Sequence, residues 1–278
     1  MFVDSHAHLF SRDFEIDLDD VIQRARDAGI RFIVCPGTDL ETSRESIGLS
    51  EKYDLVYACV GFHPHEASKA DGRSLEEIET LSHHQKVVAI GEIGLDYHYN
   101  FSPPEVQRAV FSQQIDIAWR RNIPIVIHSR EAEEDTRRIV GEKIVAENNK
   151  HDAEPNELHP RLRSWGVFHC FAGDLAMAKK VIEWGFYISI PGPVTFPVKS
   201  GKNGTMIEVV QGIPVEHLLL ETDSPYLAPQ PYRGRRNEPS YIPIIAKKVS
   251  ELKGLSLEDV ASASTLGAQT LFGIADQA

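Results

Sequence analysis

Short apolar segments recur along the chain and alternate with segments whose apolar residues follow helical spacing. Most of the apolar segments are rich in Val and Ile and show no polar alternation, which is typical of strands in a parallel sheet buried on both faces. We predict eight strands, at Phe2–His6, Arg31–Pro36, Leu55–Gly61, Val87–Glu92, Pro124–His128, Gly166–Cys170, Phe186–Ile190 and His217–Glu221.

Helix signals lie between the predicted strands. Asp17 is placed to cap a helix that Gly29 ends, and the apolar residues between them follow helical spacing. Further helix starts are predicted at the capping box Ser74-Leu75-Glu76-Glu77, at Ser102-Pro103-Pro104-Glu105, at Asp174 and at Ser256.

Eight strands that alternate with helices in a chain of 278 residues predict a (β/α)8 TIM barrel formed as a single domain over residues 1–278. A doubly wound open sheet is the alternative, but no GxGxxG turn follows the first strand. The polar stretch Gly141–Ser164 is longer than a usual connection. We interpret it as a helix extension and loop inserted at the surface, where added length costs little stability.

Composition and charge narrow the class of protein. The chain is 42% hydrophobic and 25% charged, as in ordinary globular proteins, and its apolar runs are too short to cross a bilayer. The three cysteines are an odd number without CxxC spacing, and no signal peptide is evident, so we expect a reduced, cytoplasmic protein. A net charge of −12 argues against broad coating of nucleic acid, but not against an enzyme that holds phosphates with metal ions and a few arginines.

Two histidines stand at the end of the first predicted strand. In an extended backbone, alternate residues point to the same side, so His6 and His8 can reach one point in space. Imidazole is the commonest side-chain metal ligand, although a lone His-x-His pair is a weak signal.

Later strands end in the same kinds of residue, which strengthens that signal. In a barrel the carboxyl ends of the strands carry the active site, and buried charges are costly unless they are paired or bound to metal. Six of the eight strands end in or run into such residues, namely His6 and His8, His63 and His65, Glu92 and Asp96, His128, His169, and Glu221 and Asp223.

These ligands offer nitrogen and oxygen without cysteine, which suits Zn²⁺, Mn²⁺, Fe²⁺ or Mg²⁺. Glu92 comes from a central strand and is the natural bridge between two ions. Only one of Glu221 and Asp223 need bind a metal ion. Asp223 is the expected ligand because it lies nearer the rim of the barrel. Taken without the other residues, His128 is interpreted equally well as a buried core histidine or as a metal ligand. The expected metal ligands are His6, His8, Glu92, His128, His169 and Asp223, enough for two ions.

A basic cluster, Arg233-Gly234-Arg235-Arg236, follows the eighth strand. Arginine pairs with phosphate in a bidentate manner, and barrels often bind phosphate near their last strands, so we take Arg233 and Arg235 as substrate-binding. From this stretch alone, however, a solvated basic loop is the better interpretation.

Seven motifs, in order and from end to end of the chain, resemble those of the TatD-related metal-dependent deoxyribonucleases, a branch of the amidohydrolase-like barrels. The matching stretches are Val3-Asp4-Ser5-His6-Ala7-His8, Val60-Gly61-Phe62-His63-Pro64-His65, Gly91-Glu92-Ile93-Gly94-Leu95-Asp96-Tyr97, Pro124 to Ala132, Phe168 to Gly173, Leu219 to Pro229, and Arg233 to Pro239.

The resemblance implies a TIM barrel with one or two metal ions. His6, His8, Glu92 and Asp223 would hold one ion, and Glu92, His128 and His169 the second. It also implies that His63 lies on the substrate side, and that Asp223 orients the attacking water. His65 and Arg130, which lie in the matching motifs, are further substrate-binding candidates.

The function we predict is a deoxyribonuclease that cleaves DNA from the 3′ end by metal-activated water, with Glu92, Asp223 and His63 as the catalytic residues and single-stranded ends as the preferred substrate. The cofactors would be two divalent ions, Mg²⁺, Mn²⁺ or Zn²⁺. One alternative is an ester or amide hydrolase, such as a D-aminoacyl-tRNA deacylase, using the same metals. A non-catalytic, partner-binding barrel is the other.

Overall fold

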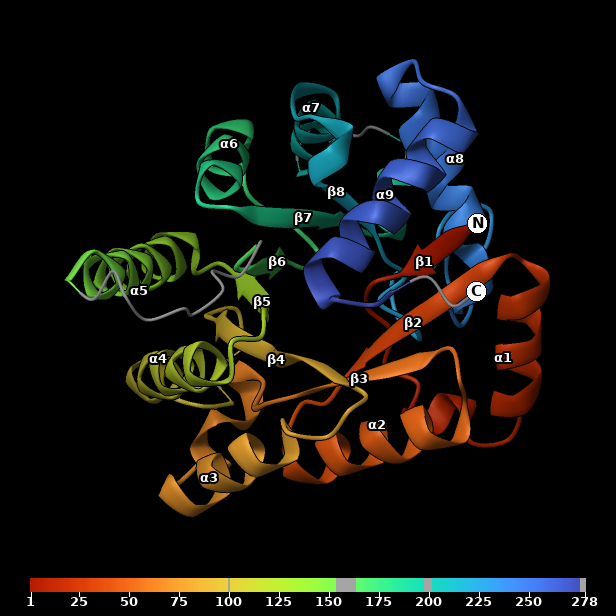
Figure 1. Cartoon of the computed structure of the whole chain (residues 1–278). Helices are drawn as coiled ribbons and strands as arrows, with labels where there is room; N and C mark the ends of the chain where they lie inside the picture. Colours follow the sequence, from red (N-terminus) through yellow and green to blue (C-terminus); the bar gives the residue numbers. More distant parts are fainter. Residues whose placement is uncertain (100, 154–163, 198–201, 276–278) are drawn as a thin grey trace.

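Eight parallel strands form one sheet in the order β1 to β8 (Figure 1). The computed structural model describes residues 1–99, 101–153, 164–197 and 202–275. The strands are β1 (Phe2–Asp4), β2 (Ile30–Pro36), β3 (Val56–Val60), β4 (Val87–Asp96), β5 (Ile125–Arg130), β6 (Gly166–Phe168), β7 (Phe186–Ile190) and β8 (Leu218–Leu220).

The sheet closes where β8 meets the chain after β1. The Ser5 N–H donates to the Leu220 carbonyl oxygen, and the Asp223 N–H donates to that of His6. A parallel bridge joins Ala7 to Ser224 just beyond the two strands. These contacts close the barrel on itself, so the predicted (β/α)8 architecture is confirmed and the open-sheet alternative is excluded.

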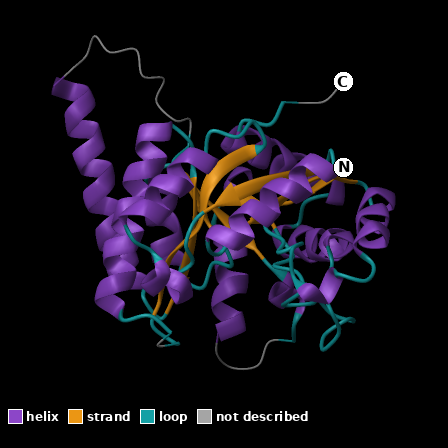
Figure 2. Ribbon diagram, turned by 90° about the horizontal axis from the view of Figure 1, so that it is seen from below, coloured by secondary structure: helices purple, strands orange, loops and turns teal. Residues whose placement is uncertain are grey.

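Helices surround the strands on the outside of the barrel, as Figure 2 shows from a second direction. A ninth helix contacts β1 and β8 and lies across the opening at the amino ends of the strands. The α-helices are α1 (Leu18–Asp27), α2 (Leu40–Lys52), α3 (Gly72–Leu81), α4 (Pro104–Arg121), α5 (Glu133–Ala153), α6 (Leu175–Glu183), α7 (Lys202–Gly212), α8 (Ile242–Lys253) and α9 (Leu257–Phe272).

Two predicted helix caps differ from the structure. The capping box predicted at Ser74 is wrong, because Asp71 is the N-cap of α3 and Ser74 is its reciprocal partner three residues later. Asp17 is the N-cap residue of α1 but makes no capping hydrogen bond, since its carboxylate binds Arg236 instead. In contrast, the Asp174 carboxylate and the Ser256 hydroxyl cap α6 and α9 as predicted.

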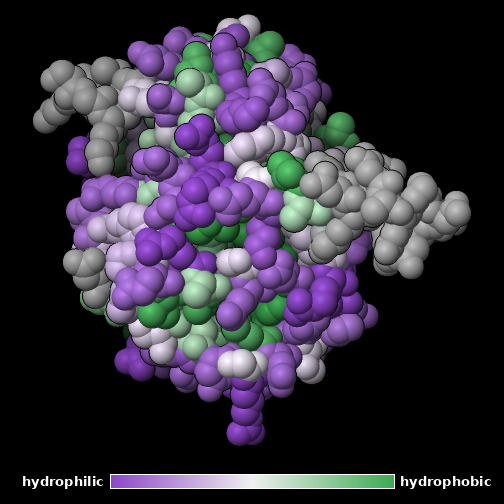
Figure 3. Space-filling model, turned by 90° about the vertical axis from the view of Figure 1, so that its left-hand side faces the viewer, coloured by the Kyte–Doolittle hydropathy of each residue, from purple (hydrophilic) through white to green (hydrophobic). Residues whose placement is uncertain are grey.

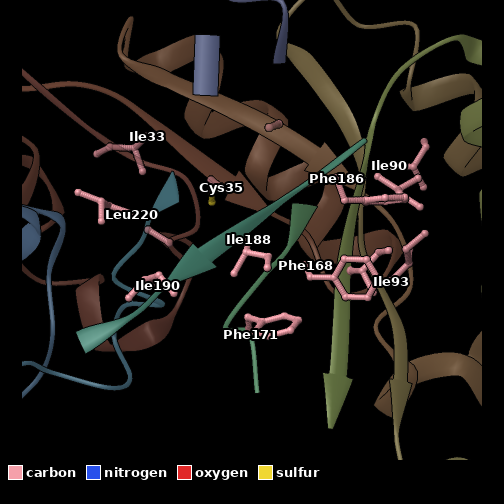
Figure 4. Close-up of a cluster of buried hydrophobic side chains, with 14 of the residues drawn as sticks. Ile33, Cys35, Ile90, Ile93, Phe168, Phe171, Phe186, Ile188, Ile190 and Leu220 are labelled. Atoms are coloured by element: carbon pink, nitrogen blue, oxygen red, sulfur yellow. The ribbon is translucent and has the colours of Figure 1, made fainter. Parts of the chain in front are cut away.

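The strands are apolar on both faces because each strand contributes side chains to two hydrophobic layers, one inside the barrel and one outside it. An inner layer fills the amino half of the barrel and includes Val34, Val126, Val167 and Leu219 of the strands with Leu271 and Phe272 of α9. An outer layer joins the strands to the surrounding helices. Figure 4 shows part of it, where Phe168 of β6 packs against Phe186 of β7 with ring centroids 5.2 Å apart.

The predicted insertion begins inside a helix. α5 continues to Ala153, which agrees with the predicted helix extension, and residues 154–163 lie outside the described residues. Hydrophilic residues cover most of the face seen in Figure 3, with apolar patches between them. Within the described parts of the chain, no helix is both long and apolar enough to cross a membrane.

Candidate metal centre

Along β5, β6 and β8 the alternation of side chains leads from the inner apolar layer to polar residues of the site. His128 follows inward-facing Val126 by two residues, and His169 follows Val167 in the same way. The same step leads from Leu219 to a carboxylate at position 221. Because residues two apart in a strand face the same side, the interior becomes polar at the carboxyl ends of the strands.

Glu92 lies at the centre of the site, and its two oxygens face different histidines. Oε2 is 3.3 Å from His6 Nε2 and 3.5 Å from His8 Nε2. Oε1 is 2.8 Å from His128 Nδ1 and 3.0 Å from His169 Nε2. One carboxylate therefore joins two histidine pairs that come from opposite sides of the barrel.

Asp223 completes the half of the site around the first pair. Its Oδ1 is 3.5 Å from His8 Nε2 and 3.8 Å from His6 Nε2. The backbone of Asp223 has a φ of 56°, a left-handed conformation that aspartate tolerates better than most residues and that is frequent at functional sites.

The spacing of these atoms fits divalent ions. His6 Nε2 lies 3.2 Å from His8 Nε2, and His128 Nδ1 lies 3.3 Å from His169 Nε2. Ligands about 2.0–2.2 Å from a shared ion lie roughly 3–3.5 Å from each other, so both pairs have the separation expected of two ligands on one ion. Clusters that could hold metal include His6 with His8 and Glu92, and His63 with Glu92 and His128.

The charges of the site are arranged to attract cations. Burial alone would raise the pKa of Glu92, but its electrostatic interactions with His169, His63 and His6 outweigh burial and hold that pKa well below its usual value. Burial also opposes ionisation of Asp223, yet its contacts with His8, His169 and His6 lower its pKa. Both carboxylates are therefore negative at neutral pH.

Glu221 is a buried carboxylate behind the second histidine pair. It accepts a hydrogen bond of 2.6 Å from the Cys170 N–H and another from the Ser189 hydroxyl. Its Oε1 also lies 3.5 Å from His169 Nδ1, on the far side of the ring from Glu92. Carboxylates in this position orient a ligating imidazole and make it more basic. Sequence reasoning placed Glu221 next to Asp223 and assigned it no separate role.

Glu221→Gln is expected to weaken binding of the ion held by His169 by about 10- to 100-fold, because the amide oxygen can still accept from the Cys170 N–H and the amide nitrogen can donate to the Ser189 hydroxyl, but the charge behind the ring is lost. Isothermal titration with Zn²⁺ or Mn²⁺ measures the change. The exposed Glu216→Gln is the matched control and should bind as the wild type does. Equal affinities in the two variants would contradict this role.

Asp4 is a second support that sequence reasoning missed. It is fully buried, accepts from the Thr222 N–H and hydroxyl at 2.9 and 2.5 Å, and accepts from the His6 N–H at 3.2 Å. Burial raises the pKa of Asp4 to about 8, against the effect of these hydrogen bonds. Asp4 thus ties the segment that carries His6 to the one that carries Asp223. The signal for it was an aspartate two residues before His6 in a buried strand.

Asp96 is a third support, at the end of β4. Its Oδ2 is 3.0 Å from His65 Nε2 and 3.1 Å from His128 Nε2. Burial opposes ionisation, but the hydrogen bonds from His128 and His65 hold the pKa of Asp96 well below its usual range. Its position at a strand end was visible in the sequence, whereas its two partners were not.

His63 joins the cluster from the loop after β3. Its Nδ1 accepts a hydrogen bond of 3.1 Å from the His65 N–H, so in the neutral ring Nε2 carries the proton, and Nε2 lies 3.4 Å from Glu92 Oε1. Burial lowers the pKa of His63 to about 4, which keeps the ring neutral at physiological pH.

The predicted substrate-binding residues lie around the rim. His65 is next to His63, with ring centroids 4.4 Å apart, and Arg130 is exposed at the end of β5. The arginines of the predicted basic cluster have different environments. Arg233 and Arg235 are exposed, while Arg236 is held by Asp17 at 2.7 Å from both of its carboxylate oxygens.

The loop that carries Arg233 and Arg235 is anchored to the end of β8. The buried side chain of Asn237 donates hydrogen bonds of 2.7 Å to the Thr222 carbonyl and 2.6 Å to the Tyr226 carbonyl. Sequence reasoning did not single out Asn237. Its contacts place the two exposed arginines on the same end of the barrel as Asp223.

A closed parallel barrel with this donor set at the carboxyl ends of its strands is the architecture of a metal-dependent hydrolase. The family model described as TatD related DNase matches residues 3–273, and the chain belongs to that family.

Relatives of the chain match it over nearly their whole length. It is 42% identical over 274 residues to the metal-dependent hydrolase YabD of Bacillus subtilis, covering 99% of this chain and 100% of the relative. It is 34% identical to the 3′-5′ ssDNA/RNA exonuclease TatD of Klebsiella pneumoniae, covering 98% and 97% of the two chains. The crystal structure of the TatD homologue YJJV from Escherichia coli superposes with a TM-score of 0.83 at 29% identity, covering 99% and 98%.

Proposed function

We propose that this chain is an exonuclease that removes nucleotides from the 3′ end of single-stranded DNA with two divalent ions, residues 1–278 acting as one catalytic domain. The observation that carries the proposal is that the two carboxylate oxygens of Glu92 face different pairs of histidines. Oε2 faces His6 and His8, and Oε1 faces His128 and His169. A carboxylate shared in this way is suited to bridge two ions about 3.5–4 Å apart, the spacing used for phosphoryl displacement.

The donor atoms suggest how the two ions would be held. His6, His8, Glu92 and Asp223 surround the first position, and Glu92, His128 and His169 surround the second. We assign Mg²⁺, Mn²⁺ or Zn²⁺, which all accept nitrogen and oxygen ligands. When bound, such ions lower the pKa of water and offset charge on the transferring phosphoryl group.

The protein's own side chains would orient the substrate and move the proton. Asp223 has a carboxylate oxygen at the edge of the first position, where it can accept a proton from the attacking water. The Nε2–H of neutral His63 can donate to a phosphoryl oxygen. His65, Arg130, Arg233 and Arg235 lie around the rim, where the arginines can pair with phosphates of the strand.

Two observations favour phosphate over a carbonyl substrate. Among the described residues whose side chains meet at Glu92 there is no lysine, so the carbamylated-lysine bridge typical of amide-hydrolysing barrels has no counterpart here. Exposed arginines that can bind phosphate lie at the same end of the barrel. The K. pneumoniae relative is also named as a single-strand exonuclease.

A paired hydrolysis assay tests the proposal. Metal-stripped protein is repleted with Mg²⁺, Mn²⁺ or Zn²⁺ and given either 3′-labelled single-stranded DNA or D-aminoacyl-tRNA. We expect metal-dependent release of the labelled nucleotide, because the site is built to offset charge at a phosphodiester. If the tRNA is deacylated while the DNA stays intact, the metal site is still correct, but the activity is that of the alternative, a deacylase.

We also place the enzyme in the cytoplasm. Its three cysteines are all free, with Cys35 and Cys59 buried, and unpaired cysteines are typical of proteins in a reducing compartment.

A further inference from the structure

Two aromatic side chains are exposed beside the metal centre, in the loop that follows β4. Tyr99 is 41% exposed and Phe101 is 67% exposed. Their rings stack on each other, with centroids 5.5 Å apart and planes inclined by 26°. Single exposed apolar residues are common on protein surfaces. A stacked aromatic pair whose rings stay largely exposed to water, in contrast, offers a surface on which a planar ligand can stack.

The pair is connected to the metal centre through one histidine. The ring of His65 lies 4.9 Å from that of Phe101 and 5.5 Å from that of Tyr99. His65 in turn binds Asp96, which also holds His128. A group that stacks on the aromatic pair therefore lies about one side chain away from the ligands around Glu92.

A positive charge lies over the ring of Tyr99. The guanidinium of Arg130 lies 4.9 Å from the centroid of Tyr99, and the side chain is exposed. Arg130 comes from the end of β5, two residues after His128. The surface thus offers the more exposed ring of Phe101 and, next to it, a cation held over the ring of Tyr99, and aromatic rings with a nearby cation can bind a base and its phosphate.

We propose that Tyr99 and Phe101 form a stacking subsite for an unpaired base near the end of the strand being cleaved, with Arg130 at the adjoining phosphate. The proposal rests on the proposed exonuclease function and names the part of the substrate that this surface recognises. A base inside a duplex has both faces covered by its neighbours, so the subsite selects single-stranded ends. Every base has a stacking face, so the selection is tolerant of sequence.

The test compares substrates with and without bases at the subsite. One single-stranded oligonucleotide carries ordinary bases at its 3′ end, and its partner carries abasic residues over the last positions. For Tyr99→Ala with Phe101→Ala we expect KM on the ordinary strand to rise about 10- to 100-fold with little change in kcat. On the abasic strand, wild type and variant should have the same KM. Phe101→Trp should keep the wild-type value, because indole also stacks.

A control variant and a binding measurement separate stacking from other effects. Leu266→Ala removes a side chain that is 65% exposed on α9, at the opposite end of the barrel, and should change nothing. Fluorescence anisotropy with a phosphorothioate strand, which resists cleavage, reports binding without turnover. We expect the double variant to lose affinity for the ordinary strand only.

The outcomes distinguish this subsite from the proposed function. If the wild type releases nucleotides but the double variant has the wild-type KM on the ordinary strand, or its KM rises by the same factor on the ordinary and the abasic strand, the stacking subsite is overturned and the exonuclease stands. If the wild type releases no nucleotide with any of the three metals, yet binds the ordinary strand more tightly than the abasic one through Tyr99 and Phe101, the subsite stands and the exonuclease fails.

Discussion

Glu92→Gln is expected to reduce metal-dependent release of nucleotide by about a thousandfold or more, while the barrel stays folded. Glutamine has the shape of glutamate but lacks the charge that faces His6 and His8 on one side and His128 and His169 on the other. Loss of a bridging carboxylate removes several kcal/mol of interaction, and about 4 kcal/mol corresponds to a thousandfold in rate. Turnover of 3′-labelled DNA and the number of ions bound per chain measure the effect.

A matched variant separates loss of charge at the site from loss of charge in general. Glu76 is exposed on α3, and Glu76→Gln should keep both activity and metal content. Circular dichroism should show the same fold for both variants, since Glu92 contacts polar groups rather than the apolar layers. If Glu92→Gln retained near-normal, metal-dependent activity on DNA, the assignment of this site would be wrong.

Gly94→Ala is expected to destabilise the protein by about 3 kcal/mol, the largest effect on folding that we predict from a single methyl group. Gly94 has a φ of 141°, which disfavours any side chain, and a Cβ at this position would lie 2.0 Å from the His128 carbonyl oxygen. At about 2–4 °C per kcal/mol, the melting temperature should fall by about 6–12 °C.

The same substitution should also weaken metal binding. Gly94 and His128 are partners in the β4–β5 register, so forcing the strands apart moves His128 Nδ1 away from its position 2.8 Å from Glu92 Oε1. Gly48→Ala is the control, because Gly48 is exposed in the middle of α2 and a methyl group added there would meet nothing within 4 Å. Alanine at that position should stabilise the helix by up to about 1 kcal/mol. A Gly94→Ala protein as stable as the wild type would show that the two strands can separate freely.

Much of the metal centre could be predicted from local sequence. His128 and His169 each follow a buried apolar strand and share the parity of an inward-facing valine, so a local rule is enough to aim them at the barrel axis. Glu92 is different, because Ile90, two residues before it, packs in the outer layer and the β4–β5 register shifts between Ile90 and Ile93. Simple alternation along β4 therefore does not aim Glu92 at the barrel axis.

Strand length was less predictable than strand position. β1 ends at Asp4, so His6 and His8 lie beyond the strand in backbone that is bound to the segment after β8. Whether a segment pairs as a strand depends on its neighbour as well as on its own residues, and those neighbours are distant in the sequence.

What the sequence by itself determined is the order of strands and helices, the barrel and the residues that meet at its carboxyl end, because these follow from the pattern of apolar segments and from the polar residues that come after them. Only the tertiary structure decided which groups support them. Asp4 meets Thr222, 218 positions away, and Asp96 meets His65, 31 positions away. It also decided that Arg236 binds Asp17 while its neighbours Arg233 and Arg235 stay exposed. Such contacts depend on which distant segments the closed barrel brings together, and no local pattern encodes them.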